Sequence, residues 1–175
     1  LLLIKDEIMY LESIINALDI ATTENDLNNI KEELIITGYI KKNSKSKSKD
    51  NKNNKPLHYI SSDGFDMYVG KNNLQNDELT FKFASNSDWW FHAKQMPGSH
   101  VIVKTNGKEL PDRTFEEAAA LAAYYSKGRD LDKVEVDYVL KKEVKKPAGA
   151  KPGFVVYYTN YSMVADTDIS KIKQL

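Results

Sequence analysis

The chain has 175 residues, 41% hydrophobic and 29% charged, which is typical of one soluble globular domain with its own core. No apolar run approaches the roughly 18 residues of a membrane-spanning helix, and no secretory signal pattern is present. Cysteine is missing, which excludes disulfides and thiolate metal sites and favours a reducing, cytoplasmic location.

The formal net charge of zero hides a division between the two parts of the chain. Residues 1–40 carry two basic and eight acidic side chains, a net charge of −6, and the remainder carries 23 basic and 17 acidic ones, a net charge of +6. This asymmetry indicates an acidic arm on a basic body. Because the chain starts with Leu in mid-pattern, we interpret it as a fragment of a longer protein.

Residues 1–40 predict two amphipathic helices. The first has an apolar stripe at helical spacing, formed by Ile4, Ile8, Leu11, Ile15 and Leu18. The second begins near Thr23, where Thr23 and Asp26 form a variant capping box, and Gly38 ends it. We expect an antiparallel helical hairpin whose narrow stripe is typical of a coiled-coil seam and through which the fragment could form a homodimer.

Residues 41–56 contain seven lysines, one Asp and no apolar residue before Pro56. Such a segment cannot bury a core, so we expect a disordered Lys-rich linker between the hairpin and a domain at 57–175.

The domain at 57–175 predicts a mostly antiparallel sheet with inserted helices, an α+β fold. Strand-like runs occur at 57–62, 65–70, 133–141, 154–159 and 163–165. Asp63-Gly64 and Asn106-Gly107 predict turns, and a short helix capped near Asn76 could run to Ala84. A longer helix is expected from a capping box at Thr114 to Gly128.

The stretch 88–104 predicts a further hairpin, with a type II turn in which Gly98 takes a positive φ after Pro97. Alternation along its first strand places Trp89, Phe91 and Ala93 on a core face. The other face carries Trp90, His92 and Lys94, an unusual set for a face meant only for water, and Trp90 could equally belong to the core.

Catalytic and metal-binding patterns are weak in this chain. A hydrolase acting on RNA or a nucleotide could use His92, His100 and Asp88, but no nucleophile elbow is present. The hairpin allows His92 and His100 to face each other, yet no third ligand accompanies them, so we expect no metal site. Phosphate-binding glycine motifs are also missing, so we predict no cofactor and no enzymatic activity.

The segment 141–153 carries five lysines against one Glu and is stiffened by two prolines. Lysines bind the phosphates of RNA without base specificity, and neighbouring aromatic rings stack on unpaired bases. The basic loop beside an aromatic face therefore favours RNA as the partner.

The chain resembles a known family at the stretches 63–84, 88–102, 134–138 and 144–153, among them DWWFHAKQMPGSHVI and VKKPAGAKPG. These stretches are similar, in the same order, to the NFACT-R domain of the RqcH/NEMF family, formerly called fibronectin-binding proteins. Residues 1–40 resemble the end of the coiled coil that precedes this domain. Trp89 departs from the family pattern, in which that position usually holds an aliphatic residue.

The resemblance implies the RNA-binding domain of a ribosome quality-control factor. Such factors bind the large ribosomal subunit with its peptidyl-tRNA and recruit tRNA so that the stalled chain receives a C-terminal alanine tail. The implied partners are the large subunit, tRNA and rRNA, with no membrane. The old family name leaves a surface fibronectin-binding adhesin as an alternative.

From the basic loop and the resemblance together we expect thirteen RNA-binding residues. They are Lys71, Asn72, Asn73, Trp90, His92, Lys94, Ser99, His100, Lys141, Lys142, Lys145, Lys146 and Lys151.

Overall fold

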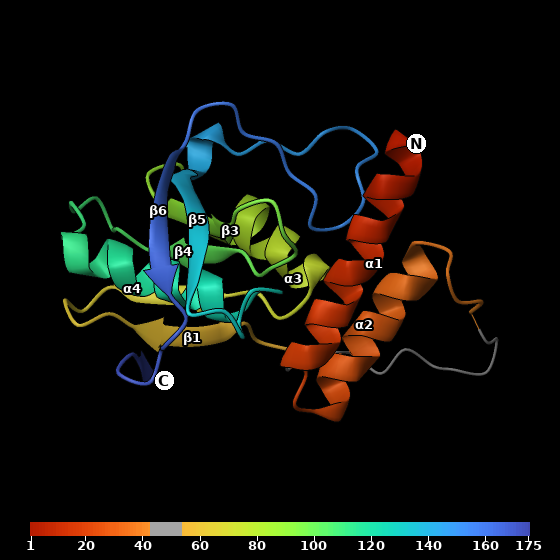
Figure 1. The fold of residues 1–175 in the computed structure, drawn as a ribbon, viewed down its shortest axis with the longest axis horizontal. Coiled ribbons are helices and arrows are strands. Elements are labelled where there is room, and N and C mark those ends of the chain that lie inside the picture. Colours follow the sequence, from red (N-terminus) through yellow and green to blue (C-terminus); the bar gives the residue numbers. More distant parts are fainter. Residues whose placement is uncertain (43–53) are drawn as a thin grey trace.

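The computed structural model describes residues 1–42 and 54–175, which form a sheet-based body with a helical hairpin beside it (Figure 1). The expected linker at 41–56 falls largely on residues 43–53, outside the described part of the chain. The helices are α1 (Leu2–Ile20), α2 (Glu24–Ile36), α3 (Asn73–Glu78) and α4 (Asp112–Tyr124), with a π-helical segment at Leu79–Phe83 and a 3₁₀ turn at Lys141–Glu143. The strands are β1 (Leu57–Ile60), β2 (Asp66–Val69), β3 (Trp89–Ala93), β4 (Val101–Val103), β5 (Lys133–Leu140), β6 (Tyr161–Asp166) and β7 (Lys173–Gln174).

The strands form one antiparallel sheet in the order β6-β5-β3-β4-β2-β1-β7, which confirms the predicted α+β class. The β1–β2 turn contains Gly64 at φ 85°, as the Asp-Gly pair predicts. Strand β3 lies near the middle, between β4 and β5, so the stretch expected to be functional is held by neighbours on both sides.

Both faces of the sheet centre are covered. Helix α4 packs on one face, where Phe91 and Ala93 join its alanines in the main core. On the opposite face, Trp90 and Ile102 pack with Leu79 of the π-helical segment in a smaller cluster. The predicted alternation along β3 is therefore correct, but Trp90 belongs to a second core and is fully buried, whereas Trp89 is half-buried.

The helical hairpin forms as predicted and has the expected ends. The Thr23 hydroxyl accepts from the Asp26 amide and the Asp26 carboxylate accepts from the Thr23 amide, so both halves of the capping box are present. Gly38 follows α2 at φ 85°, and Tyr39 N donates to the Leu34 carbonyl in a Schellman-type ending.

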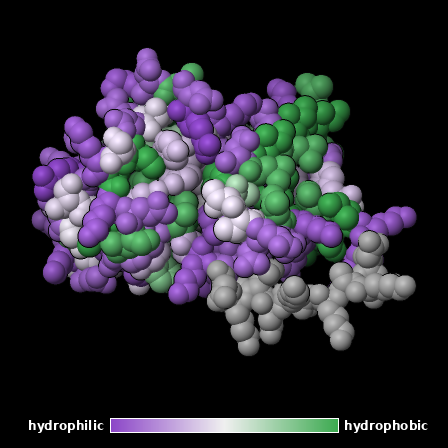
Figure 2. All heavy atoms as spheres, turned by 90° about the horizontal axis from the view of Figure 1, so that it is seen from below, coloured by the Kyte–Doolittle hydropathy of each residue, from purple (hydrophilic) through white to green (hydrophobic). Residues whose placement is uncertain are grey.

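The predicted apolar stripe of α1 is not the face that meets α2. Ile4, Ile8 and Ile15 are 61%, 53% and 58% exposed, whereas the hairpin core is formed by another face of α1 with Tyr10 and Ala17. Spacing alone identifies an apolar face without showing what covers it, and Figure 2 shows hydrophobic residues gathered along the hairpin. The homodimer stays a prediction. None of the described helices is long and apolar enough to cross a membrane.

The boundaries of α4 differ from the expected ones. The helix begins at Asp112 after Pro111, because the Thr114 hydroxyl donates to Ser61 and Asp63 instead of capping. It ends at Tyr124, not at Gly128. Gly128 meets a packing need: a Cβ there would lie 2.7 Å from a methyl of Val134.

Three further local predictions, of a turn, a helix cap and a strand, are also wrong in detail. Gln95 takes the positive φ (53°) of the β3–β4 connection, while Gly98 packs so closely that a Cβ would lie 3.0 Å from Ser126. The short helix α3 is capped by Asn72, because the Asn76 side chain instead accepts the His100 amide. Residues 154–159 form no strand, and their backbone joins the fold through one bridge between Lys145 and Val156.

Candidate nucleic-acid interface

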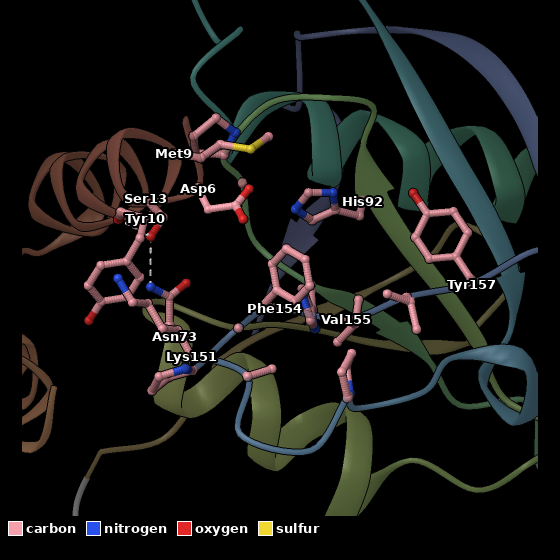
Figure 3. A pocket seen from close by; sticks show the side chains of 18 of the residues that line it. Asp6, Met9, Tyr10, Ser13, Asn73, His92, Lys151, Phe154, Val155 and Tyr157 are labelled. Carbon is pink, nitrogen blue, oxygen red and sulfur yellow. Dashed lines mark hydrogen bonds between the residues drawn. The ribbon is translucent and has the colours of Figure 1, made fainter. Parts of the chain in front are cut away.

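A cleft of about 1060 Å³ opens between α1 and the segment 147–158, with β3 at its floor (Figure 3). We call it the α1 cleft. Its lining includes Asp6, Met9 and Tyr10 from α1, Trp90, His92, Lys94 and His100 from the β3–β4 region, and Lys151, Phe154 and Tyr157 from the loop segment. The structure thus brings together six of the thirteen predicted residues: Asn73, Trp90, His92, Lys94, His100 and Lys151.

His92 and His100 face each other as expected, with ring centroids 5.5 Å apart at 89°. Burial lowers the pKa of His92, and it lowers the pKa of His100 well below the ordinary range, with His92 adding to that shift. Both rings are therefore neutral at pH 7 and can serve as hydrogen-bonding groups, not as phosphate-binding cations. The Nδ1 atom of His100 is already paired with the Thr80 hydroxyl at 2.8 Å.

Trp90 supports this histidine pair from within the fold. Its ring stacks on His92 at 5.6 Å and 11° and meets Tyr157 at 5.0 Å. Its Nε1 atom is buried without a hydrogen-bond partner among the described residues.

Asp137 is a cleft residue that sequence reasoning missed. It lies opposite His92 in the β3–β5 register and is 5% exposed. Its carboxylate accepts from Tyr157 Oη at 2.8 Å and Ser162 Oγ at 2.5 Å. Only the pairing of β5 with β3 would have indicated this position. From the alternation along its own strand, Asp137 is expected to face solvent.

The lysines of the loop at 141–153 differ in how far contacts within the protein fix them. Lys146 Nζ lies 2.9 Å from Asp77, which also accepts the Gly153 amide, so this ion pair shapes the loop. Lys151 Nζ lies 4.7 Å above the Tyr10 ring and reaches α1 across the cleft. Lys142 is exposed, and so is Lys145, whose Nζ donates to the Lys142 carbonyl. The half-buried Lys141 lies 6.0 Å from the Phe81 ring centroid.

The predicted residues 71–73 hold the helical hairpin against the body. Lys71 Nζ lies 2.6 Å from Asp26 of α2, and their side chains are 14% and 3% exposed. The Asn73 amide donates to Glu33 and to Ser13, each at 2.8 Å. These side chains are occupied by contacts within the protein.

Asn72, Ser99 and His100 are also interior residues. Asn72 is 4% exposed and caps α3 by accepting the Gln75 amide. Ser99 and His100 are each 1% exposed.

Lys94, just beyond β3, is instead near the surface, where it pairs with Glu135 at 2.6 Å.

The three residues of the hydrolase alternative do not converge. Asp88 is not among the cleft residues, and its carboxylate accepts from Lys104 at 2.5 Å and from the amides of Ser85 and Thr105. Within residues 1–42 and 54–175, no three His, Cys, Asp or Glu side chains cluster in a way that could hold a metal ion.

The family assignment follows from residues 55–159, which match the model of the NFACT protein RNA-binding domain. This region includes the sheet centre, the cleft floor and the Lys-rich loop. The chain belongs to the NFACT-R family. The resemblance read from the sequence motifs is thus confirmed.

Known proteins extend this similarity to the helical hairpin. The chain is 44% identical over 172 residues to the Rqc2 homolog RqcH of Streptococcus suis and 39% identical over 175 residues to that of Bacillus subtilis. These matches include 98% and 99% of this chain, respectively, but the chain spans only 30% of the length of each relative. The solved C-terminal part of the fibronectin/fibrinogen-binding protein from Streptococcus suis superposes with a TM-score of 0.87 at 43% identity, covering 95% of this chain and 66% of that one.

Proposed function

We propose that this chain is the RNA-binding part of a ribosome quality-control factor. It binds the large ribosomal subunit that carries peptidyl-tRNA, contacts tRNA and rRNA, and helps to recruit tRNA for alanine tailing of the stalled chain. The peptidyl transfer belongs to the ribosome, so the chain binds and positions without catalysing, and its place of action is the cytoplasm. The match of residues 55–159 to an RNA-binding domain carries this proposal, and the names of the RqcH relatives support it.

Within this proposal the predicted residues take two roles. The accessible groups contact RNA: Lys94, Lys141, Lys142, Lys145 and Lys151, together with the half-buried His92. The buried groups and the ion-paired Lys146 hold the surface in shape; the buried ones are Lys71, Asn72, Asn73, Trp90, Ser99 and His100. This division follows from desolvation, because a buried paired lysine cannot reach a phosphate without leaving its carboxylate unpaired.

Charge reversal in the loop tests the proposal. Lys142→Glu with Lys145→Glu should weaken binding to large subunits carrying peptidyl-tRNA and flatten the dependence of log K on log salt by about 0.7–0.9 per lost phosphate contact. Lys171→Glu is the matched control, because Lys171 is exposed and belongs to the C-terminal segment, whose marked end lies on the other side of the body from the loop in Figure 1. Equal binding by both variants would remove the loop from the interface, and no binding by the unaltered chain would refute the RNA-binding role.

A second candidate is supported by the name of the structural relative, a fibronectin/fibrinogen-binding protein. In that case the chain is an adhesin fragment that binds immobilised fibronectin. Binding to fibronectin with no binding to ribosomal RNA, measured on the same preparation, would favour this candidate over the first.

A further inference from the structure

We propose that the α1 cleft holds one unstacked base of a bound single-stranded RNA, with its phosphates on the side of the Lys-rich loop. This inference rests on the proposed RNA-binding function and names the part of the ligand that enters the cleft. The cleft's volume of about 1060 Å³ exceeds what one base needs, so the adjoining ribose fits as well.

Exposed aromatic rings carry the inference. Phe154 is 49% exposed and Tyr158 is 89% exposed, and both line the cleft. Figure 3 shows the Phe154 ring projecting into the space between α1 and His92. A large ring left open beside a cavity is a stacking platform for any unpaired base, because every base offers a π-face.

The charges around the cleft determine on which side the RNA backbone lies. The α1 wall carries Asp6 and Glu7, which repel phosphate but can accept hydrogen bonds from the exocyclic amino groups of bases. The opposite side is formed by the loop segment, from which Lys151 reaches across to Tyr10 of α1; further along the loop, Lys145 and Lys142 are exposed. Phosphates therefore follow the loop while the base points inward.

The floor of the cleft suits a neutral heteroaromatic ring. His92 stays uncharged there, because burial lowers its pKa, and an uncharged imidazole offers one donor and one acceptor. Beneath it, Trp90 and His100 are packed and hold its ring in place. A cationic floor would instead favour a phosphate or a carboxylate, and the Asp137 carboxylate opposite His92 disfavours both at the bottom of the cleft.

The test uses the 175-residue chain and short single-stranded RNAs, each with the fluorescent base aminopurine at a different position. Stacking quenches this base, so at least one position should be quenched on binding, and Phe154→Ala should abolish that quenching and weaken affinity by roughly 5- to 100-fold. Phe154→Trp should restore both. Tyr161→Ala removes a ring that is 60% exposed on β6 outside the cleft, and it should leave the quenching unchanged.

A second arm removes the base instead of the ring. An RNA with an abasic nucleotide at the quenched position should bind the unaltered chain as weakly as the intact RNA binds Phe154→Ala, and combining both changes should cost little more. If RNA binds but no position is quenched, or if Phe154→Ala keeps the quenching, the cleft assignment is overturned while the RNA-binding role stands. If the unaltered chain binds none of the RNAs, the proposed function itself fails.

Discussion

Two lysine-bearing stretches of this protein have the same predicted role but very different surroundings. Lys71 is 14% exposed and pairs with a buried carboxylate on the helical hairpin, whereas Lys142 and Lys145 project from the loop into solvent. Residue type and local sequence do not separate these cases. What separates them is Asp26, which lies 45 residues from Lys71 along the chain and 2.6 Å from it in space.

The comparison also explains the division of charge along the chain. Two acidic residues of the hairpin, Asp26 and Glu12, pair with Lys71 and Lys127 of the body. The acidic arm thus neutralises part of the basic body, whereas Lys142 and Lys145 of the loop at 141–153 stay exposed. Net charge by segment therefore gives the sum correctly but not the location of the uncompensated charge.

Removing the buried ion pair should give the largest change in stability. Lys71→Met leaves Asp26 buried without its cation, and we expect a loss of about 3 kcal/mol in the free energy of unfolding. The cost should lie at the lower end for such pairs because Asp26 keeps hydrogen bonds from the Thr22 and Thr23 amides. Chemical denaturation measures the loss.

The matched variant Lys142→Met should behave in the opposite way. Its stability should change by less than about 0.5 kcal/mol, while its RNA affinity falls and that of folded Lys71→Met does not. If Lys71→Met weakens RNA binding more than Lys142→Met does under conditions where both are folded, the contrast between the two stretches is wrong.

A pair of glycine variants tests where the loop and the hairpin support meet. Gly153 has φ 79°, and a Cβ there would lie 2.4 Å from the Asn73 amide oxygen. Gly149 has φ 72°, with nothing within 4 Å of its Cβ position. Gly149→Ala should cost about 1 kcal/mol through backbone strain, and Gly153→Ala about 2 kcal/mol because it also displaces Asn73.

The heat-induced unfolding of the two alanine variants distinguishes these terms. Equal losses would show that Asn73 moves aside freely and that the loop does not depend on the hairpin support. We expect Gly153→Ala to lose more stability than Gly149→Ala. This excess should disappear when Gly153→Ala is made in an Asn73→Ala background.

The buried Glu33 should make the stability of the protein depend on pH. Burial raises the pKa of this carboxyl, and its hydrogen bonds from Asn73 and Tyr10 only partly oppose the shift. The folded state therefore holds the proton more tightly than the unfolded state, so this group's contribution to stability falls as pH rises from the ordinary Glu range through the folded pKa. Glu33→Gln should remove this slope and stabilise the protein by about 1 kcal/mol at neutral pH.

The neighbouring Asp26 should show the opposite slope. Burial alone would raise its pKa, but hydrogen bonds from Lys71 and the backbone outweigh burial and lower it. Its contribution is present above the ordinary Asp range and is lost as pH falls through the lowered pKa. Unfolding measured from about pH 3 to pH 8 for the unaltered chain, Glu33→Gln and Lys71→Met tests both slopes. Lys71→Met should weaken the Asp26 slope because it removes the main group that lowers that pKa. Parallel curves for Glu33→Gln and the unaltered chain would contradict the Glu33 assignment.

Sequence patterns predict the local elements of this protein well because their causes are local. The alternation along β3, the Asp-Gly turn at Gly64 and the capping box of Thr23 and Asp26 depend on neighbouring residues, and all three are present. The cap assigned to Thr114 fails because Ser61 and Asp63, more than 50 positions away in sequence, take its hydroxyl.

The candidate site is predicted less completely for the same reason. The sequence placed Trp90 and His92 on one face of β3, but it could not show that the Leu79–Phe83 segment and residues 144–157 cover that face. Covering Trp90 turns it from a stacking surface into core, and the accessible rings become Phe154 and Tyr158, which lay in a wrongly predicted strand. Long-range packing thus changes which aromatic rings are accessible without changing the family assignment.

The smallest expected effect concerns Lys94, which lies between the two extremes of the comparison. It pairs with Glu135 at 2.6 Å, but the two side chains are 34% and 50% exposed, and the hydrogen bond from Glu135 raises the pKa of Lys94. Exposed pairs contribute little, so Glu135→Gln should leave the unfolding curve unchanged. A phosphate that approaches Lys94 would then no longer compete with a carboxylate, and RNA affinity should rise by a few-fold, measured by titration at low salt. A gain distinguishes this variant from every loss predicted above, and weaker RNA binding by Glu135→Gln would place Lys94 with Lys71 among the lysines that hold the fold.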